Sequence, residues 1–449
     1  MVKKKKKVYS TAVLLFGILA PMPIINLFSI TMYVWCIMIL GMIALVKWVN
    51  KGRVKLDKQY DRAFAAVIAT WVISYLICAI RMPAKWTSGI GTSFVQLCFL
   101  IIVYIFFSQK EKVQYLAYYV KGVYISSIIQ MMWGYAQILF DAIGQDLNTI
   151  VFRDILQMMG EYATQYQFGR LKVSGLCWNA GNFAPLITFG YIYTKNSYLK
   201  MAFLLLGFLS GSRTLMLGLF VGAIIEWILV GKFKATITKK KMIFLAVAII
   251  VVAIVFLTNR DIVFRKVMEI ADLLDIKNRV KTEGSANTHL YYLTSIPEIT
   301  IKNDFISNLF GYGPGCSGYA QSELMNLYVT SDKWSIECDY VNQLWSYGYI
   351  GFVVYYYWYL KNLVKTIKID KKYIALFAAF LFEGLLYNIT FNWVLFLVIS
   401  IFLLATVYKG NIIKNLIMDC QSYTKYRPNE TTGGIFVSWR RKEELLTGA

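Results

Sequence analysis

The chain has 449 residues, of which 58% are hydrophobic and only 16% are charged, and its formal net charge is +22. A soluble globular protein would be about 25% charged, so this composition excludes a soluble enzyme, a disordered chain and a secreted disulfide scaffold. Long uncharged runs also exclude a transmembrane β-barrel, whose strands alternate in polarity, and the sequence predicts an all-α polytopic membrane protein.

The N-terminal segment begins with Lys3 to Lys7 and continues as an uncharged stretch from Val8 to Val46. A signal peptide has an apolar region of only about 7 to 15 residues, so we expect two retained transmembrane helices here. A helix needs about 20 apolar residues to cross about 30 Å of hydrocarbon, and by this rule the chain has about twelve spans. They cover residues 9–28, 30–49, 63–80, 88–107, 114–140, 175–194, 198–212, 214–231, 242–258, 340–360, 373–389 and 391–408.

Lysine and arginine in the connections predict the orientation, because cytoplasmic loops carry an excess of them. With the N-terminus inside, 32 of the 47 Lys and Arg residues fall on the inner side. We therefore expect both termini in the cytoplasm. The basic charge then faces anionic inner-leaflet lipid rather than nucleic acid.

The spans divide the chain into four parts. Residues 1–258 hold the first nine helices and an outer connection at 141–172, and residues 259–339 form a large extracytoplasmic loop between helices 9 and 10. Residues 340–408 hold the last three helices, and residues 409–449 form a cytoplasmic tail. The large loop is far longer than an ordinary connection, so an active domain outside the bilayer is expected there.

Arg213 ends the shortest predicted span. Only 12 uncharged residues separate it from Lys200, and as a helix they reach about 18 Å, well short of the hydrocarbon thickness. We therefore expect a turn at residues 210–213, with Arg213 below the outer surface. A single long helix over 201–231 is the alternative, but it would place the lysines at 232–241 outside. An arginine at membrane depth is a functional candidate, although a structural ion pair with an outer-loop acid would also explain it.

The guanidinium group of Arg213 suits the oxygens of a diphosphate, which it can hold bidentately. A charged substrate headgroup in an outward vestibule would recruit other cations on the same side. Each of these cations would also be compatible with a solvated loop charge. The candidates are Arg170, Lys172, Arg265 and Arg279.

Glu337 and Asp339 precede the span at 340–360 and are expected at the outer membrane edge. A carboxylate there could take the proton from an attacking hydroxyl as a general base, and interfacial acids that end a loop are the alternative. His289, the only histidine of the chain, lies on the same outer loop and is either structural or catalytic. With no second histidine and no clustered cysteines, a zinc site is not expected.

Three charged residues fall within spans. Lys121 and Glu226 lie within about two turns of an inner end and can extend to the interface, which leaves Glu383 as the one deep acid. A proton-coupled transporter would usually have more such residues.

Two further features belong to the outer loop. The run Gly311-Tyr312-Gly313-Pro314-Gly315 lacks the βαβ context of a nucleotide-binding motif, and we expect a tight loop that packs closely against the membrane domain. Cys316 and Cys338 share the loop and could pair in an oxidising exterior.

Several short motifs follow one another along the chain. They are Gly169-Arg170, Ser174-Gly175-Leu176, Gly181-Asn182-Phe183-Ala184, Ser212-Arg213, Leu309-Phe310-Gly311-Tyr312-Gly313 and Gly348-Tyr349-Ile350-Gly351. Their order, spacing and membrane side resemble those of the O-antigen polymerase and ligase (Wzy/WaaL-like) superfamily, over residues 170–355. Gly181 stands where that family usually has proline. The ligase branch has a histidine eleven residues before the paired glycines. Glu337 occupies that position here, which resembles the polymerase branch.

The resemblance implies a metal-independent glycosyltransferase with a GT-C-like fold and no cofactor, in the cytoplasmic (inner) membrane of a bacterium. It would transfer a growing glycan from polyprenyl diphosphate to a sugar hydroxyl of another lipid-linked repeat unit on the outer face. Arg213, Arg170 and Arg279 would neutralise the diphosphate, and Glu337 would act as the base, with Asp339 or His289 as substitutes. The partners implied are the lipid-linked oligosaccharide, the bilayer and a chain-length regulator protein.

We therefore predict a repeat-unit polymerase for O-antigen, capsule or exopolysaccharide. A ligase of the same superfamily, which attaches finished glycan to its acceptor, is one alternative. A flippase or exporter of lipid-linked glycan is the alternative from another class, disfavoured by the long outer loop and the few deep charges.

Overall fold

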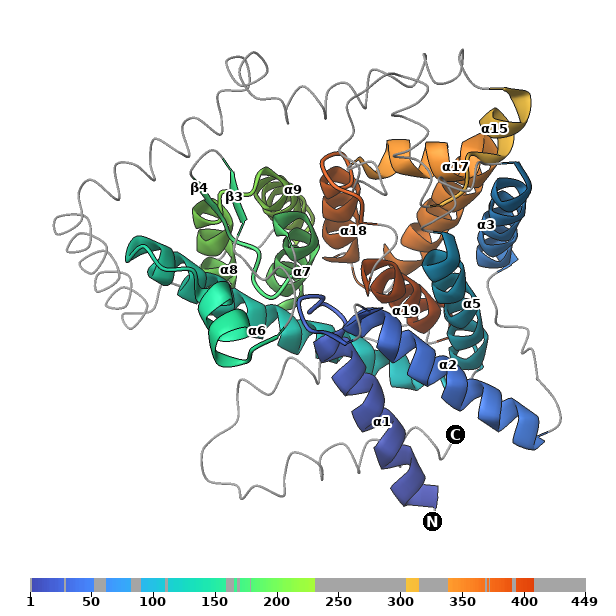
Figure 1. Ribbon diagram of the computed structural model, residues 1–449, viewed down its shortest axis with the longest axis horizontal. Coiled ribbons are helices and arrows are strands. Elements are labelled where there is room, and N and C mark those ends of the chain that lie inside the picture. The colour runs from blue at the N-terminus through green and yellow to red at the C-terminus, as the bar shows by residue number, and fades with distance from the viewer. Residues whose placement is uncertain are drawn as a thin grey trace.

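The computed structural model of the protein is largely helical (Figure 1). It describes residues 2–27, 30–51, 62–81, 90–109, 112–158, 165–167, 170–177, 179–230, 304–314, 338–367, 370, 372–389 and 393–407. The helices of the first half are α1 (Val2–Leu19), α2 (Met32–Lys51), α3 (Arg62–Arg81), α5 (Ile90–Phe107), η1 (Val113–Tyr115), α6 (Leu116–Ala142) and η2 (Thr149–Ile155). They are followed by α7 (Ala180–Tyr193), α8 (Ser197–Leu209), α9 (Arg213–Val230), α15 (Phe305–Phe310), α17 (Asp339–Ile367), α18 (Lys372–Glu383) and α19 (Trp393–Val407).

Within the part of the chain that the structure describes, two short antiparallel hairpins interrupt the helices. β1 (Asn26–Leu27) pairs with β2 (Ile30–Thr31) between α1 and α2. β3 (Gln165–Gln167) pairs with β4 (Arg170–Lys172) before α7, with Gln165 opposite Lys172.

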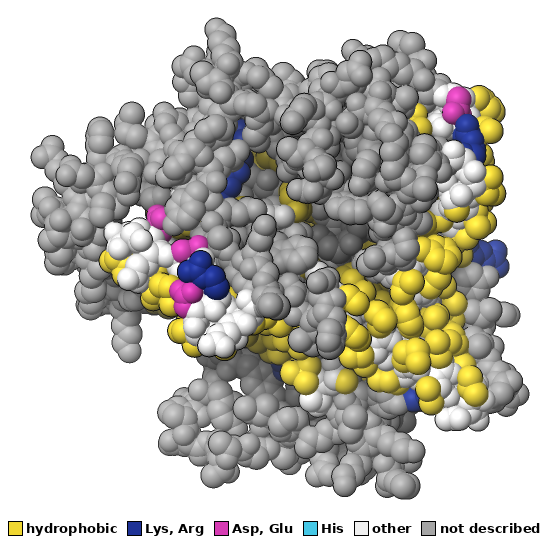
Figure 2. Space-filling view, in the orientation of Figure 1, with side chains coloured by type: hydrophobic (Ala, Val, Ile, Leu, Met, Phe, Trp, Pro, Cys, Tyr) yellow, Lys and Arg dark blue, Asp and Glu magenta, His cyan; other side chains and the backbone are white. Residues whose placement is uncertain are grey.

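The predicted helical membrane fold is confirmed in its coarse form. Helices lie in every predicted range except 242–258, which lies outside the described residues. Within the described part of the chain, the segments Met32–Asn50, Arg62–Arg81 and Val113–Ala142 are long and apolar enough to cross a membrane. Figure 2 shows a broad hydrophobic surface where Figure 1 places α2 and α5. Exposed side chains such as Ile39, Met42 and Val46 belong to α2, as expected of a lipid-facing helix.

Several predicted spans differ from the helices observed. In the range 9–28, α1 ends at Leu19 and residues 26–27 form strand β1. The range 340–360 is not one straight helix, because α17 breaks at Gly348, where φ is +64°, a conformation that glycine adopts without steric cost. The range 373–389 holds only the short helix α18, which ends at Glu383 and is followed by a turn at 384–386.

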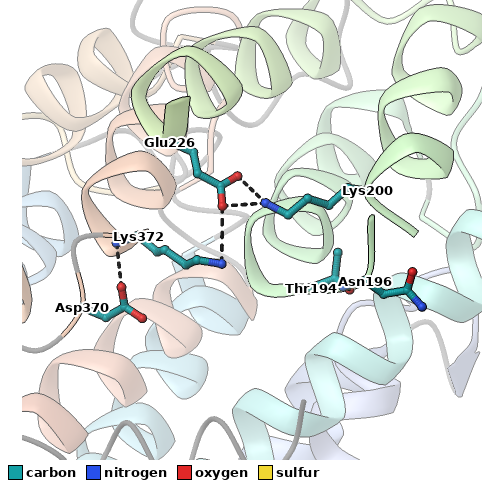
Figure 3. A network of polar contacts seen from close by, with 6 residues as sticks. All are labelled: Thr194, Asn196, Lys200, Glu226, Asp370 and Lys372. Carbon is teal, nitrogen blue, oxygen red and sulfur yellow. Dashed lines mark hydrogen bonds and ion pairs between the residues drawn. The ribbon is translucent and has the colours of Figure 1, made fainter. Parts of the chain in front are cut away.

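An ion-pair network joins α8, α9 and α18 at one end of the bundle (Figure 3). Lys200 donates through Nζ to both carboxylate oxygens of Glu226, and Nζ of Lys372 lies 3.4 Å from Glu226 Oε1. Nζ of Lys200 also lies 4.9 Å from the ring centroid of Tyr191. The side chain of Glu226 is 10% exposed, and its two partners are lysines that the sequence places in inner connections.

Replacing Glu226 with glutamine should destabilise this end of the bundle by about 1–3 kcal/mol, because two partly buried lysines lose their counter-charge. Thermal unfolding of the purified protein in detergent measures the effect. Asp154→Asn is the matched control, since the Arg153–Asp154 pair is exposed and such pairs contribute little. An equal change in both variants would contradict a structural role for the network.

A second junction joins α15 to α3 and α17. The backbone N–H groups of Tyr312 and Gly313 donate to the carbonyls of Trp345 and Ser346, at 2.8 and 3.0 Å, just before the break in α17. The hydroxyl of Ser74 on α3 donates to the Phe310 carbonyl at 2.7 Å. The predicted tight loop at residues 311–314 is therefore confirmed, while Gly315 and Cys316 lie outside the described residues. Cys338 is a buried free thiol.

An ion pair fastens the start of α15. Arg81, the last residue of α3, lies 2.9 Å from Asp304, which also accepts from the Ser307 N–H as the N-cap of α15. The hydrogen bond from Arg81 holds the pKa of Asp304 below its ordinary value. A carboxyl with a lowered pKa stabilises the fold above its unfolded pKa of about 4 and loses this contribution as the pH falls.

Asp304→Asn should therefore remove a pH-dependent contribution while keeping the cap, since asparagine caps helices as well as aspartate does. Near pH 6 we expect the wild type to be more stable by at most about 1 kcal/mol, because both side chains are partly exposed. At pH 3 the difference should shrink. Melting curves of both proteins at the two pH values provide the test, and a difference that does not change with pH would contradict it.

Candidate functional site

The predicted turn before Arg213 is present. α8 ends at Leu209 and α9 begins at Arg213, and Gly211 between them has a φ of +66°. The Ser212 hydroxyl accepts from the Leu215 N–H at 3.3 Å in the first turn of α9. Arg213 is thus the first residue of a helix and is half-buried, rather than the middle of one long helix.

The strand β4 lies directly against this turn. The Val173 N–H donates to the Ser210 carbonyl at 3.0 Å, and a Cβ on Gly211 would lie 2.6 Å from the carbonyl oxygen of Leu171. Only glycine allows this approach. These contacts place strand β4, which contains Arg170 and the half-buried Lys172, beside the turn that precedes Arg213. Figure 2 shows Lys and Arg side chains where Figure 1 places this strand.

A buried amide network fixes the loop that follows β4. The N–H groups of Gly175 and Leu176 donate to Oε1 of Gln137 and of Gln130, both at 2.9 Å. Gln130 in turn donates to the Pro21 carbonyl at 2.6 Å. Gly175 has a φ of +59°, so the Ser174-Gly175-Leu176 motif is a turn anchored to α6.

The start of α7 is capped and covered by the segment after α18. Asn179 accepts from the Asn182 N–H at 2.8 Å and donates through Nδ2 to the hydroxyl of Tyr387 at 2.6 Å. A Cβ on Gly181 would lie 2.2 Å from the Tyr387 ring. This contact explains why glycine occupies position 181, since a proline ring there would collide with Tyr387.

Glu383 lies in the middle of this part of the bundle and is fully buried. Its Oε1 accepts from the Thr188 hydroxyl of α7 at 2.6 Å, and a Cβ on Gly218 of α9 would lie 1.9 Å from the same oxygen. Its Oε2 has no hydrogen-bond partner. Glu383 is eleven residues from Lys372 along α18, about 16 Å, so the deep position expected from the sequence agrees with its burial.

Asp339 meets the end of α18. It is the first residue of α17, and its N–H donates to the carbonyl of Gly384 at 2.8 Å. Its residue exposure is 5%. Asp339 is therefore enclosed at the junction of α17 and α18.

The helices α7, α9 and α17 begin at the same end of the bundle. Glu383 contacts both Thr188 of α7 and Gly218 of α9, and Gly222 of α9 lies next to Ile192 of α7, so α7 and α9 run parallel. α18 runs antiparallel to α9, since Lys372 pairs with Glu226. The N-termini of α7, α9 and α17 therefore lie at the end opposite the Lys200–Glu226–Lys372 network.

This end of the bundle is suited to an anion. A helix N-terminus carries a partial positive charge and unpaired N–H groups, and it binds phosphates and carboxylates. Arg213 adds a full positive charge at the N-terminus of α9, and Lys172 lies on the strand beside the turn that precedes it. Among the described residues, no group of three or more His, Cys, Asp or Glu side chains is placed to hold a metal ion.

The structure brings some of the predicted site residues together and leaves others undescribed. It places the strand that contains Arg170 and Lys172 beside the turn that precedes Arg213, and it places Asp339 at the α17–α18 junction. Glu337, His289, Arg265 and Arg279 lie outside the described residues. Asn179 and Tyr387, which contact each other at the start of α7, were not among the predicted residues. An asparagine just before an apolar run is an N-cap signal and could have located Asn179, whereas no local pattern indicates Tyr387.

No protein-family model matches the chain, and no curated protein matches it significantly.

Proposed function

We propose that the protein is a repeat-unit polymerase of a surface polysaccharide in the cytoplasmic membrane of a bacterium. It transfers a growing glycan from polyprenyl diphosphate to a sugar hydroxyl of another lipid-linked repeat unit at the outer face. The observation that supports this best is the turn between α8 and α9, which presents Arg213 beside β4 and the N-terminus of α7. The sequence motifs of the polymerase branch coincide with this turn and its neighbours.

The main requirement of this reaction is that the enzyme stabilises developing negative charge. The bond between the anomeric carbon and the diphosphate oxygen breaks, so negative charge develops on a diphosphate already bound at the membrane surface. Fixed donors aimed at developing charge can supply much of an enzyme's rate enhancement. Arg213 binds the diphosphate bidentately, Lys172 and Arg170 add charge, and the helix N-termini orient N–H groups toward it.

A base completes the transfer. The acceptor hydroxyl attacks the anomeric carbon from the face opposite the diphosphate, which inverts the configuration, and its proton passes to a carboxylate. Glu337 is the first candidate for this base, because it takes the position of the ligase histidine. Asp339, two residues later, lies at the start of α17 within the same short segment, and His289 is the third candidate.

Glu337→Gln should abolish polymer formation while the protein remains in the membrane, because an amide cannot take the proton. General bases contribute about 10²–10⁴-fold to the rate of a reaction, so the rate of polymer formation should fall by this factor relative to the wild type. Asp339→Asn serves as the comparison, since its amide keeps the size of the side chain and leaves the backbone contact to Gly384 intact. Full-length polymer from Glu337→Gln together with none from Asp339→Asn would transfer the role of base to Asp339.

Reconstitution tests the activity directly. The purified protein is placed in liposomes with lipid-linked repeat units, and the products are resolved by size. We expect a ladder of lipid-linked chains and release of one polyprenyl diphosphate for each bond formed. Unchanged single repeat units under these conditions would contradict the proposal.

A further inference from the structure

The helix α18 lies between the two sides of the proposed site. It contacts α7, α9 and α17, and Figure 1 shows it between the pair α7–α9 and α17. α9 begins with Arg213, and α17 begins with Asp339, one of the candidate bases. The last turn of α18 therefore bears on the separation between the N-terminus of α9 and that of α17.

The end of α18 is fastened to the start of α17 through backbone carbonyls. The Gly384 carbonyl accepts from the Asp339 N–H at 2.8 Å, and the Leu381 carbonyl accepts from the Tyr340 hydroxyl at 2.6 Å. These carbonyls lie on either side of Glu383 in the chain. The start of α17 is therefore coupled to the position of Glu383.

The side chain of Glu383 fastens the same turn to α7 and α9. Its Oε1 accepts from the Thr188 hydroxyl of α7 at 2.6 Å, and an added Cβ on Gly218 of α9 would collide with the same oxygen. Gly218 follows Arg213 by about 7.5 Å along the helix, which is less than two turns. The carboxyl group of Glu383 thus meets α9 close to its positively charged start.

Stability alone does not account for an acid at this position. Glu383 is fully buried, and among the described residues its Oε2 has no hydrogen-bond partner. Burying a polar atom unpaired is costly, and an apolar side chain of similar length would fill the space between the helices without this cost. Ionisable residues within membrane spans are rare, and a functional role is their default interpretation.

We propose that Glu383 is a positioning residue of the site, and that its carboxyl group sets the spacing between Arg213 on α9 and Asp339 on α17. This inference rests on the proposed polymerase function. Glu383 acts through the helices rather than on the substrate. Its Oε1 holds α18 against α7 and α9, and the backbone of the same turn holds α17. A displacement of about 1 Å between reacting groups can lower a rate about 10²-fold, so a small change at Glu383 reaches the chemistry.

Two substitutions of Glu383 test this role with the full-length protein and lipid-linked repeat units in liposomes. Glu383→Met keeps an unbranched side chain of similar length but removes the acceptor for Thr188. We expect its kcat per folded protein to fall about tenfold or more, with KM within about twofold of the wild type. Glu383→Gln keeps an acceptor oxygen and should retain kcat within about threefold. Equal losses of kcat in the two variants would overturn the inference.

Glu226→Gln is the matched control for a purely structural effect. Glu226 is also a buried acid, and it ties α9 to α18 at the opposite end of these helices. This variant should lower the melting temperature and leave kcat per folded protein unchanged. If Glu383→Met likewise changes only the melting temperature or the amount of folded protein, the role of Glu383 is structural and the inference is overturned.

A second pair of variants reaches the same contact from α9. Gly218→Ala places a methyl group where the Glu383 carboxyl group lies, so kcat should fall about tenfold or more. Gly222→Ala is the control, because its Cβ would lie 3.0 Å from the terminal methyl group of Ile192, and it should retain the kcat of the wild type. Wild-type kcat from Gly218→Ala would overturn the inference even if Glu383→Met does not fold. If the wild type forms no polymer, the proposed function itself fails.

Discussion

Arg213→Ala should lower the rate of polymer formation by about 10²–10³-fold, the usual effect of removing one donor aimed at developing negative charge. Arg213 is the first residue of α9 and is held beside β4 by the bond from Val173 N–H to Ser210. Its removal leaves the glycine turn intact, so the protein should still fold and enter the membrane. The measurement is the rate of ladder formation in liposomes, together with the amount of protein in the membrane fraction.

Two further variants separate charge from geometry. Arg213→Lys keeps the charge but loses the bidentate fork, and an intermediate rate is expected. Arg153→Ala removes an exposed arginine that pairs with its neighbour Asp154, and it should leave the rate unchanged. Full-length polymer at the wild-type rate from Arg213→Ala would remove this residue from the mechanism.

Gly348→Ala should have the largest effect on folding. Gly348 has a φ of +64°, and an added Cβ would lie 2.4 Å from the backbone of Leu309. The left-handed conformation costs about 1–2 kcal/mol for alanine, and a clash with backbone atoms adds about 1–3 kcal/mol. Since proteins are stable by only about 5–15 kcal/mol, we expect a marked loss of folded protein, measured by gel filtration and thermal unfolding in detergent.

Gly144→Ala provides the matched control. Gly144 also has a positive φ, +74°, but an added Cβ would meet no atom within 4 Å. This substitution carries only the conformational cost, about 1–2 kcal/mol. If Gly348→Ala is no more destabilising than Gly144→Ala, the close approach of α15 to α17 does not support the break in α17.

Short stretches of the sequence were sufficient to predict several elements of the structure. The twelve uncharged residues between Lys200 and Arg213 are too few to cross the bilayer. Together with the lysines at 232–241, they predicted the turn that separates α8 from α9. The glycine-rich run at 311–315 predicted a tight packed loop, and residues 311–314 have this form. Apolar length located the helices, because each helix in lipid must satisfy its own backbone.

Contacts between distant segments could not be predicted in this way. The ring of Tyr387 on Gly181 and the bond from Asp339 to Gly384 each join segments that no local pattern relates. The sequence also does not reveal that Lys200 and Lys372 meet at the carboxylate of Glu226. The break at Gly348 was missed because hydropathy averages over a span and is insensitive to one glycine.

The most direct test of the polymerase function is to delete the gene in its host and to resolve lipid-linked glycans and surface polysaccharide by size and by membrane side. We expect single repeat units to accumulate on the outer face with no ladder, and a wild-type copy of the gene to restore the ladder. Single units held on the inner face would contradict the account and indicate a flippase. Long lipid-linked chains that never reach their final acceptor would contradict it as well and indicate a ligase.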